Sequence, residues 1–334
     1  MLFKSFTRLW QPDCAIDLGT ATTRVALARG GYRFAEPSSR APAVPALEHG
    51  VVVNVDAAAE AMRPALRRLG HLGVAAHPRV LACAPTDASA EEREAVVEAC
   101  YRAGAAAVVL MPEPVAAALG DGIDYASPVA TLLMDIGEGV TDCAVIRRGA
   151  LGTAFASRIA CADLRAAARD AVLAASGVEI SDAEAARVVA EVGVQPPSLD
   201  DFGLPLLLRS VRVTPAGAVA ADGATAASPD AQTWVPAGLI EQALEPVAIR
   251  IVGTVRSLLV ATPGLRRELR ESGASILLSG GGALIPGFVA RVKQATGLPV
   301  RVVRQPLDAV VEGAKRVLPH AAAHDLWGQV SGKR

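Results

Sequence analysis

One short element occurs twice in this chain of 334 residues and constrains its fold more than any other feature. A hydrophobic strand ends in Asp-(Leu/Ile)-Gly, a tight polar turn with Thr follows, and a second apolar strand begins. The copies are AIDLGTATT at 15–23 and MDIGEGVTD at 134–142. The duplication predicts two related halves, and the length of the chain suits two domains with separate cores.

The chemistry of this element favours an anionic ligand. Glycine lets a hairpin turn bring backbone N–H groups close to an anion. The aspartates two residues earlier, Asp17 and Asp135, would repel a phosphate directly. They make sense if a hydrated Mg²⁺ lies between the carboxylates and the phosphate oxygens. We therefore expect two facing hairpins to hold a nucleotide tail from opposite sides, with both aspartates binding the waters of the metal.

A third segment, ILLSGGGALIPG at 276–287, joins an apolar strand to a helix through three glycines. Such bare backbone allows a flat ligand ring or a phosphate to pack directly on it. The segment has neither the Lys-Ser/Thr of a P-loop nor the G-x-G-x-x-G spacing of a dinucleotide-binding turn. The alternative is that the glycines only allow tight packing of strand against helix.

Between these motifs the chain alternates between strands and helices. Strands are expected at 79–84, 108–111, 129–135, 143–147, 275–279 and 300–303, and helices at 90–102, 114–119, 162–175, 182–192, 237–260, 286 onward and 308–318. Ser89 and Glu92 form a capping box before the first of these helices. Residues 194–236 are rich in Pro, Gly, Ala and Asp, and only 204–214 resembles a strand, which predicts a peripheral subdomain with a long loop.

Composition excludes several classes of protein. Lys and Arg number 33 against 34 Asp and Glu, and no basic run offers a stripe for nucleic acid. Apolar runs are shorter than the ~18 residues that a membrane span needs. The 5 cysteines are scattered, which is typical of reduced thiols in a cytosolic protein rather than of disulfides or a zinc site.

The amino-terminal segment 1–12 has an amphipathic pattern that Pro12 ends. Its apolar side chains repeat on one helical face, and they are Leu2, Phe3, Phe6, Leu9 and Trp10. Aromatic residues on one side and cations on the other suit the surface of an anionic bilayer. The alternatives are a frayed terminus or a helix packed on its own domain.

Taken in order, DLGTATT, MPEPVAAALG, MDIGEGVTD and LLSGGGALIPG resemble the motifs of the actin-like ATPase superfamily, and within it the bacterial MreB/Mbl rod-shape proteins. The resemblance covers nearly the whole chain, is close over 79–120 and is weakest over 194–236. It implies an α/β actin-like fold of two related domains around a nucleotide cleft. The first domain would comprise 13–128 and 306–328, and the second 129–305 with an outer subdomain at about 176–236.

The same resemblance implies roles for individual residues. Glu113 matches the acid that positions the attacking water, with Asp135 beside it as a catalytic residue and, together with Asp17, as a ligand of Mg²⁺ through water. ATP or ADP would be bound by Asp17, Gly19, Thr20 and Thr22 of the first hairpin, Gly137, Gly139 and Thr141 of the second, and Gly280, Gly281 and Gly282 at the adenosine.

Several positions depart from the family pattern. Glu138 replaces the middle glycine of the second hairpin, where it would cost backbone freedom and, if it pointed inward, oppose the phosphates. Ala186 and Val189 replace a Glu and a Lys that contact the ribose, although Glu184 could supply the acid if the helix register were shifted. We therefore expect weakened nucleotide binding and weak or absent ATP hydrolysis.

The outer part of the first domain, near 36–60, is shorter than in the family. This favours assembly with a full-length MreB-type paralogue, although the chain could also polymerise by itself. The leading hypothesis is a cytoplasmic cytoskeletal protein, peripheral at the inner face of the cytoplasmic membrane, that organises cell shape and the cell wall. The alternatives are an active ATPase or sugar-kinase-type enzyme of the same superfamily, and a nucleotide-dependent chaperone or adaptor.

Overall fold

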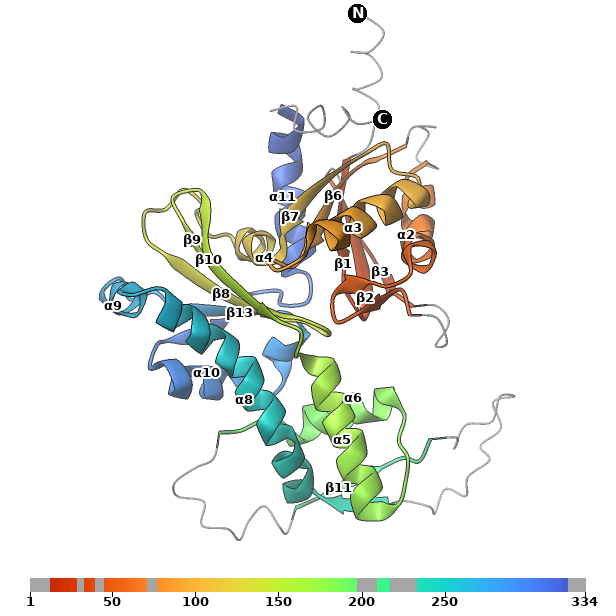
Figure 1. Cartoon of the computed structure of the whole chain (residues 1–334), viewed down its shortest axis with the longest axis vertical. Coiled ribbons are helices and arrows are strands. Elements are labelled where there is room, and N and C mark those ends of the chain that lie inside the picture. The colour runs from red at the N-terminus through yellow and green to blue at the C-terminus, as the bar shows by residue number, and fades with distance from the viewer. Residues whose placement is uncertain are drawn as a thin grey trace, which may run out of the picture.

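The computed structural model describes residues 13–28, 33–39, 45–70, 77–196, 209–216 and 233–323. Its framework is two five-stranded sheets with the same topology (Figure 1). The strand orders are β3-β2-β1-β6-β7 and β10-β9-β8-β13-β14. In each sheet three consecutive antiparallel strands are followed by two parallel ones. The duplication seen in the two hairpins thus extends to both sheets.

The elements of the first half run from the first hairpin to the helix that follows β7. They are β1 (Asp13–Leu18), β2 (Thr22–Leu27), β3 (Arg33–Pro37), β4 (Leu47–Glu48), β5 (Val51–Val52), α2 (Val55–Gly70), β6 (Arg79–Ala84), α3 (Ala90–Ala103), β7 (Ala107–Pro112) and α4 (Glu113–Asp121). The last helix, α11 (Ala309–Ala323), returns to this half and packs on β1, β2, β6 and α4.

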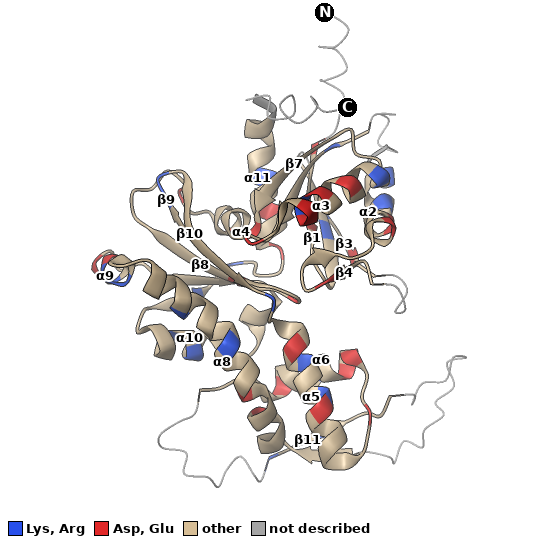
Figure 2. Ribbon diagram, viewed as in Figure 1, with Lys and Arg blue, Asp and Glu red and all other residues tan. Residues whose placement is uncertain are grey.

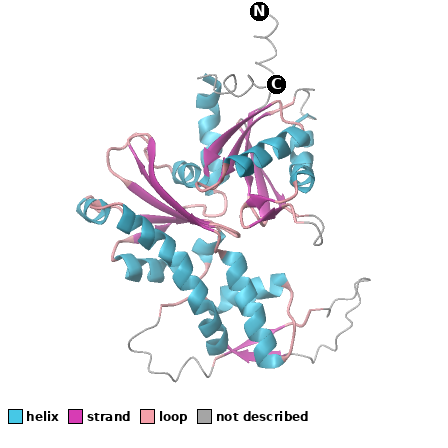
Figure 3. Cartoon of the chain, in the orientation of Figure 1, coloured by secondary structure: helices cyan, strands magenta, loops and turns pink. Residues whose placement is uncertain are grey.

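The second half is larger. Its elements are β8 (Thr131–Ile136), β9 (Thr141–Arg147), β10 (Ala150–Ser157), α5 (Cys161–Ser176), α6 (Asp182–Val192), β11 (Ser210–Val213), β12 (Thr233–Pro236), α8 (Ala237–Ala261), α9 (Leu265–Glu271), β13 (Ile276–Ser279), the 3-10 helix η1 (Gly281–Leu284), α10 (Phe288–Thr296) and β14 (Val300–Val302). Helices α5 and α6 and the pair β11–β12 form a lobe beyond the second sheet (Figure 3).

The central strands of both sheets are buried on both faces. Along β8, Leu132, Met134 and Ile136 face the core shared with α5, α6, α8 and α10, whereas Leu133 faces the opposite way. Leu133 belongs instead to a core with α4 and α11, to which the first sheet contributes Leu81. Alternate side chains of a strand point to opposite faces. The two helices α4 and α11 therefore form a common layer between the sheets.

Close backbone contact holds this layer together. A Cβ atom added at Gly313 of α11 would lie 1.7 Å from the carbonyl oxygen of Ala116 in α4, and one at Gly120 would lie 2.0 Å from that of Ala309. Only glycine fits at such distances. The crossing of α4 and α11 is thus a tightly packed joint between the two halves.

Most helices and strands predicted from the sequence are confirmed within a few residues. The capping box of Ser89 and Glu92 begins α3, and Gly104 ends it in a left-handed conformation. Strands β3, β10 and β12 and helices α2 and α9 were not predicted. Strand β12 pairs with β11, which lies inside the predicted strand at 204–214.

The outer parts of the two halves differ in size. In the described part of residues 36–60, regular structure beyond β3 consists of the short strands β4 and β5 and the start of α2. The predicted amphipathic segment 1–12 lies outside the described residues. Within the described part of the chain, no helix is long and apolar enough to cross a membrane. Lys and Arg residues are spread over several helices of both halves (Figure 2).

Candidate functional site

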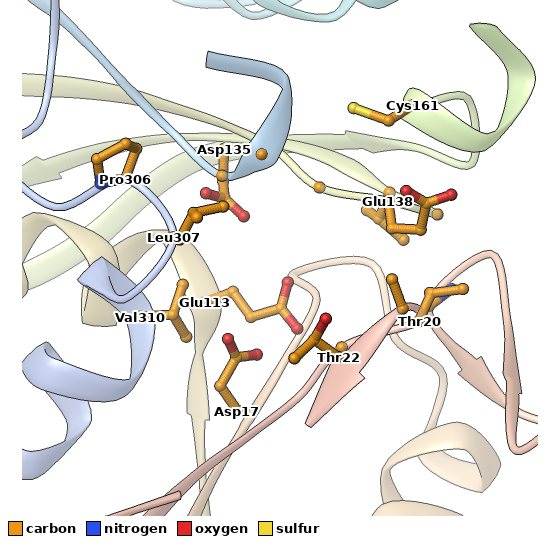
Figure 4. Close-up of a pocket in the computed structure, with 18 of the residues that line it drawn as sticks. Asp17, Thr20, Thr22, Glu113, Asp135, Glu138, Cys161, Pro306, Leu307 and Val310 are labelled. Atoms are coloured by element: carbon orange, nitrogen blue, oxygen red, sulfur yellow. The ribbon is translucent and has the colours of Figure 1, made fainter. Parts of the chain in front are cut away.

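A cavity of about 380 Å³ lies between the two halves, where both hairpins and the glycine segment meet (Figure 4). Most of the predicted site residues line it: Asp17, Gly19, Thr20, Thr22, Glu113, Asp135, Gly137, Gly139, Gly280 and Gly281. Two predicted binding residues do not. The buried Thr141 donates a hydrogen bond to the carbonyl of Ile159 at 2.7 Å, and Gly282 is packed against Ile136.

The second hairpin touches the first half of the chain directly. A Cβ atom at Gly139 would lie 2.5 Å from Oγ1 of Thr20 and 2.6 Å from Cα of His49. Thr20 in turn accepts a hydrogen bond from the N–H of Gly50 at 2.9 Å. Gly139 is therefore required by the close approach of the two halves.

The glycine segment has two different functions in the structure. Gly280 has φ +80° and a Cβ atom there would lie 2.3 Å from the carbonyl oxygen of Ile136, so this glycine permits strand–helix packing. Gly281 lines the cavity, and a Cβ atom there would meet nothing closer than Leu307 at 3.7 Å. The packing explanation thus applies to Gly280 and Gly282, whereas Gly281 leaves room for a flat ligand.

Three acidic side chains converge in the middle of the cavity (Figure 4). Asp17 ends β1, Asp135 ends β8 and Glu113 begins α4. Burial raises the pKa of Asp17 to about 7, although the nearby Arg24 opposes that rise. Burial also raises the pKa of Asp135, against a hydrogen bond from Ser279. The pKa of Glu113 lies well above its ordinary value because burial and the charges of both aspartates add together.

Too little positive charge surrounds these three carboxyl groups to compensate their negative charge. Arg24 lines the cavity beside them, yet its Nε is also 3.4 Å from Asp308. Raised pKa values mean that the charged forms are poorly compensated, which a cation would correct. Among the described residues no group of three or more His, Cys, Asp or Glu could hold a metal directly. The two facing aspartates therefore fit a hydrated divalent ion better than a dehydrated one.

Glu138 differs from the sequence expectation. Its φ is not positive, so the expected cost in backbone freedom is wrong. Both of its carboxylate oxygens are paired with the guanidinium of Arg165, a cavity residue that the sequence analysis missed. The signal in the sequence that could have indicated Arg165 was Glu138, because a carboxylate buried on a hairpin turn requires a cationic partner.

The far wall of the cavity is apolar. Ala186 and Val189 of α6 line it, with Leu284 at the end of η1, Ile285 after it and Leu307 before α11.

The shifted helix register considered for Glu184 is wrong. Glu184 binds Arg187 and accepts a hydrogen bond from the N–H of Thr214 at 2.8 Å, and it does not line the cavity. Helix α6 thus offers no charged side chain to a ligand in this cavity.

Two polar contacts join the halves beside the cavity. The buried Asp142 of β9 accepts hydrogen bonds from Thr86 of the first half, at 2.7 Å from N–H and 2.6 Å from Oγ1. Arg158, after β10, donates to the carbonyl of His49 at 2.8 Å and binds Asp87. These contacts hold the two halves together on this side of the cavity.

Comparison with known proteins assigns the chain to a family. The family model of MreB/Mbl proteins matches residues 37–325. The cell shape-determining protein MreB of Escherichia coli K12 is 27% identical over 98% of this chain and 100% of its own length. The cell shape-determining protein Mbl of Bacillus subtilis is 26% identical over 90% of this chain and 94% of its own.

Solved structures agree on the fold. MreB5 of Spiroplasma citri bound to AMPPNP has a TM-score of 0.78 and 23% identity, and covers 95% of this chain and 99% of its own. A MamK double helical filament has a TM-score of 0.71 and 17% identity, and covers 92% of this chain and 98% of its own. The fold is thus that of the actin-like ATPases. Together with the match over residues 37–325, these findings place the chain in the MreB/Mbl family of actin-like, cell shape-determining proteins.

Proposed function

We propose that this protein is a membrane-associated actin-like cytoskeletal protein that binds an adenine nucleotide with Mg²⁺ and organises cell shape and the cell wall. The observation that carries the proposal is the common cavity of the two hairpins and Gly281. A protein of the same fold, MreB5 of Spiroplasma citri, has been solved with AMPPNP and with ADP.

In this proposal each part of the cavity binds a different part of the ligand. The backbone N–H groups of the two hairpins, around Gly19–Thr20 and Gly137–Gly139, bind the phosphates. Asp17 and Asp135 hold the waters of Mg²⁺, which neutralises phosphate charge when bound. The adenosine packs on Gly281 against the apolar wall of Ala186 and Val189.

ATP hydrolysis is weak or lost in this proposal. An apolar α6 wall gives the ribose hydroxyls no side-chain partner, and a bound group that loses hydrogen bonds loses affinity and alignment. The alternative is an active ATPase or sugar-kinase-type enzyme, which is favoured by one observation, the presence of Glu113 in the same cavity as Asp17 and Asp135.

We further propose that the protein polymerises, or joins filaments of a full-length MreB-type paralogue. A related fold forms a double helical filament. The small outer part of the first half favours the paralogue, since its regular structure beyond β3 is two short strands and the start of α2. Interface energy, not hydrolysis, would hold such an assembly together.

One experiment separates these functions. Mg·ATP binding, phosphate release and pelleting are measured on the same samples, with and without vesicles containing anionic lipid. The cytoskeletal proposal expects nucleotide binding, slow phosphate release and pelleting that grows with protein concentration. Fast phosphate release that is independent of lipid, without pelleting, would establish the enzyme instead.

The membrane anchor is tested separately by vesicle flotation. The full chain should float with anionic vesicles, and a chain that begins at Pro12 should not, because it lacks Phe3, Phe6 and Trp10. The full chain with Phe3 and Phe6 changed to Ser is the matched control for loss of the apolar face alone. Equal flotation of the full and shortened chains would contradict the proposed anchor.

A further inference from the structure

The ion pair between Glu138 and Arg165 lies at the boundary of two cavities. The cavity described above contains both residues, and so does a second cavity of about 460 Å³, which is further lined by Ser39, Glu48, His49 and Asp182. Thr20 of the first hairpin also lines both. The wall between the cavities is thus built from Thr20 and Ala21 of the first hairpin, Glu138 of the second hairpin and Arg165.

Asp182 of the second cavity holds the Arg165 side chain of this wall in place. Arg165, on the first turns of α5, has its Nε 2.9 Å from Oδ2 of Asp182 at the start of α6. Asp182 is also bound by Arg169. Glu138 and Arg165 are both largely buried, with side chains 15% and 18% exposed. Because Glu138 and Asp182 both hold the guanidinium, Arg165 is pre-organised, and it loses little side-chain entropy in its pairing with Glu138.

The carboxylate of Glu138 pairs with the guanidinium of Arg165 in the way that a phosphate group would. Carboxylate and phosphate both bind the planar guanidinium through two parallel N–H groups. Because Glu138 points to Arg165 from the middle of the second hairpin, it fills that position with an internal anion. It lies to the side of the cavity next to Thr20, away from the group of Asp17, Glu113 and Asp135 (Figure 4).

We propose that Glu138, positioned by Arg165, sets the phosphate count of the ligand and makes the cleft prefer a nucleoside diphosphate to a triphosphate. Glu138 lies on the turn whose backbone N–H groups bind phosphate in the proposed function. A third phosphate bound at that turn would meet the Glu138 carboxylate, and Arg165 would already be paired with that carboxylate. This inference rests on the proposed nucleotide binding and adds to it the class of nucleotide bound.

The test is the ratio of two affinities on the full chain, measured by calorimetric titration of Mg·ADP and Mg·AMPPNP. The wild-type chain should bind ADP at least about tenfold more tightly than AMPPNP. In Glu138→Gly, which restores a small residue and frees Arg165, AMPPNP should bind about tenfold more tightly than in wild type, and ADP within about threefold of it. Glu184→Gln removes a carboxylate of the same lobe that lies outside the cavity, and it should leave the ratio unchanged.

Arg165 is tested by a graded pair of variants. Arg165→Gln leaves Glu138 charged and unpaired beside the phosphates, so both affinities should fall, that for AMPPNP more. Arg165→Lys keeps the charge and should restore part of the loss, which a merely structural role of the side chain would not predict. Melting temperatures identify any variant that fails to fold, and Glu138→Gly then decides alone.

The outcomes are distinguishable. A wild-type chain that binds both nucleotides equally, or a Glu138→Gly chain whose two affinities change by the same factor, overturns the inference and leaves the proposed function standing. Absence of binding of either nucleotide to the folded wild-type chain and to Glu138→Gly overturns both.

Discussion

At the residue scale, the buried carboxyl groups in and beside the cavity make the free energy of unfolding depend on pH. Asp142 is 1% exposed, and burial raises its pKa to about 7 despite two hydrogen bonds from Thr86. In the unfolded chain an aspartate ionises near its ordinary pKa of 3.8. The unfolded state therefore releases a proton at lower pH than the folded state, and this group's contribution to stability is lost as pH rises from about 4 to about 7.

Replacement of Asp142 by Asn should remove this dependence. The amide keeps one acceptor for the N–H of Thr86 and one donor for its hydroxyl, yet it does not ionise. We expect Asp142→Asn to stabilise the protein without ligand by roughly 4 kcal/mol more at pH 8 than at pH 4. Urea unfolding at both pH values measures the difference. A stability gain that does not change with pH would show that Asp142 is already charged in the folded chain.

Glu113 allows a second residue-scale prediction about hydrolysis. Its carboxyl group lies in the cavity with Asp17 and Asp135. If it positions the attacking water, Glu113→Gln should reduce Mg-dependent phosphate release to background, because general-base groups contribute roughly 10²–10⁴-fold. Mg·ADP affinity should stay within about threefold of wild type. Unchanged phosphate release would assign any hydrolysis to other residues.

At the scale of elements, the structure shows which sequence patterns were informative. The capping box at Ser89 and the buried strand β6 were predicted because their signals are local. Helix α2 was missed because its core side chains are mostly alanines, such as Ala58 and Ala65, and because Pro64 interrupts the pattern. Strand β10 is an edge strand with a bulge near Leu151, so it shows no clear alternation.

The site was predictable to a similar extent. The hairpin residues lie on motifs with local signals, and most of them line one cavity. Arg24 and Arg165 were not predicted, because each is recognised only through a partner elsewhere in the chain, such as Glu138 at a separation of 27 residues. Tertiary pairing of this kind leaves no periodic or motif signal in a single sequence.

The second hairpin gives the prediction at this scale. Gly139→Ala would place a Cβ atom within 2.6 Å of the His49 backbone, so the hairpin and the first half must separate. We expect a loss of about 1–3 kcal/mol in stability and weaker Mg·ADP binding. Gly253→Ala is the control, because α8 leaves open space there and the substitution should gain up to about 1 kcal/mol. Equal effects of the two substitutions in urea unfolding would contradict the close contact.

At the scale of the whole molecule, two similar sheets are joined through the layer of α4 and α11, and the cavity lies where their hairpins meet. Asp142 and Arg158 connect the halves on the cavity side. A ligand that contacts both hairpins at once would add to these contacts. Nucleotide bound in the cleft should therefore stabilise this arrangement and raise the melting temperature, by an amount that grows with the logarithm of its concentration above the Kd.

Calorimetric titration of Mg·ADP into three chains shows whether the cleft binds an adenine nucleotide with Mg²⁺. The wild-type chain should bind one ADP per chain. Ala186→Phe, which fills the apolar wall of the cavity from the exposed side of α6, should weaken binding at least about tenfold. Ala183→Phe, on an exposed position of the same helix outside the cavity, should bind like wild type. A wild-type chain that does not bind Mg·ADP, or an Ala186→Phe chain that binds it unchanged, would contradict the account.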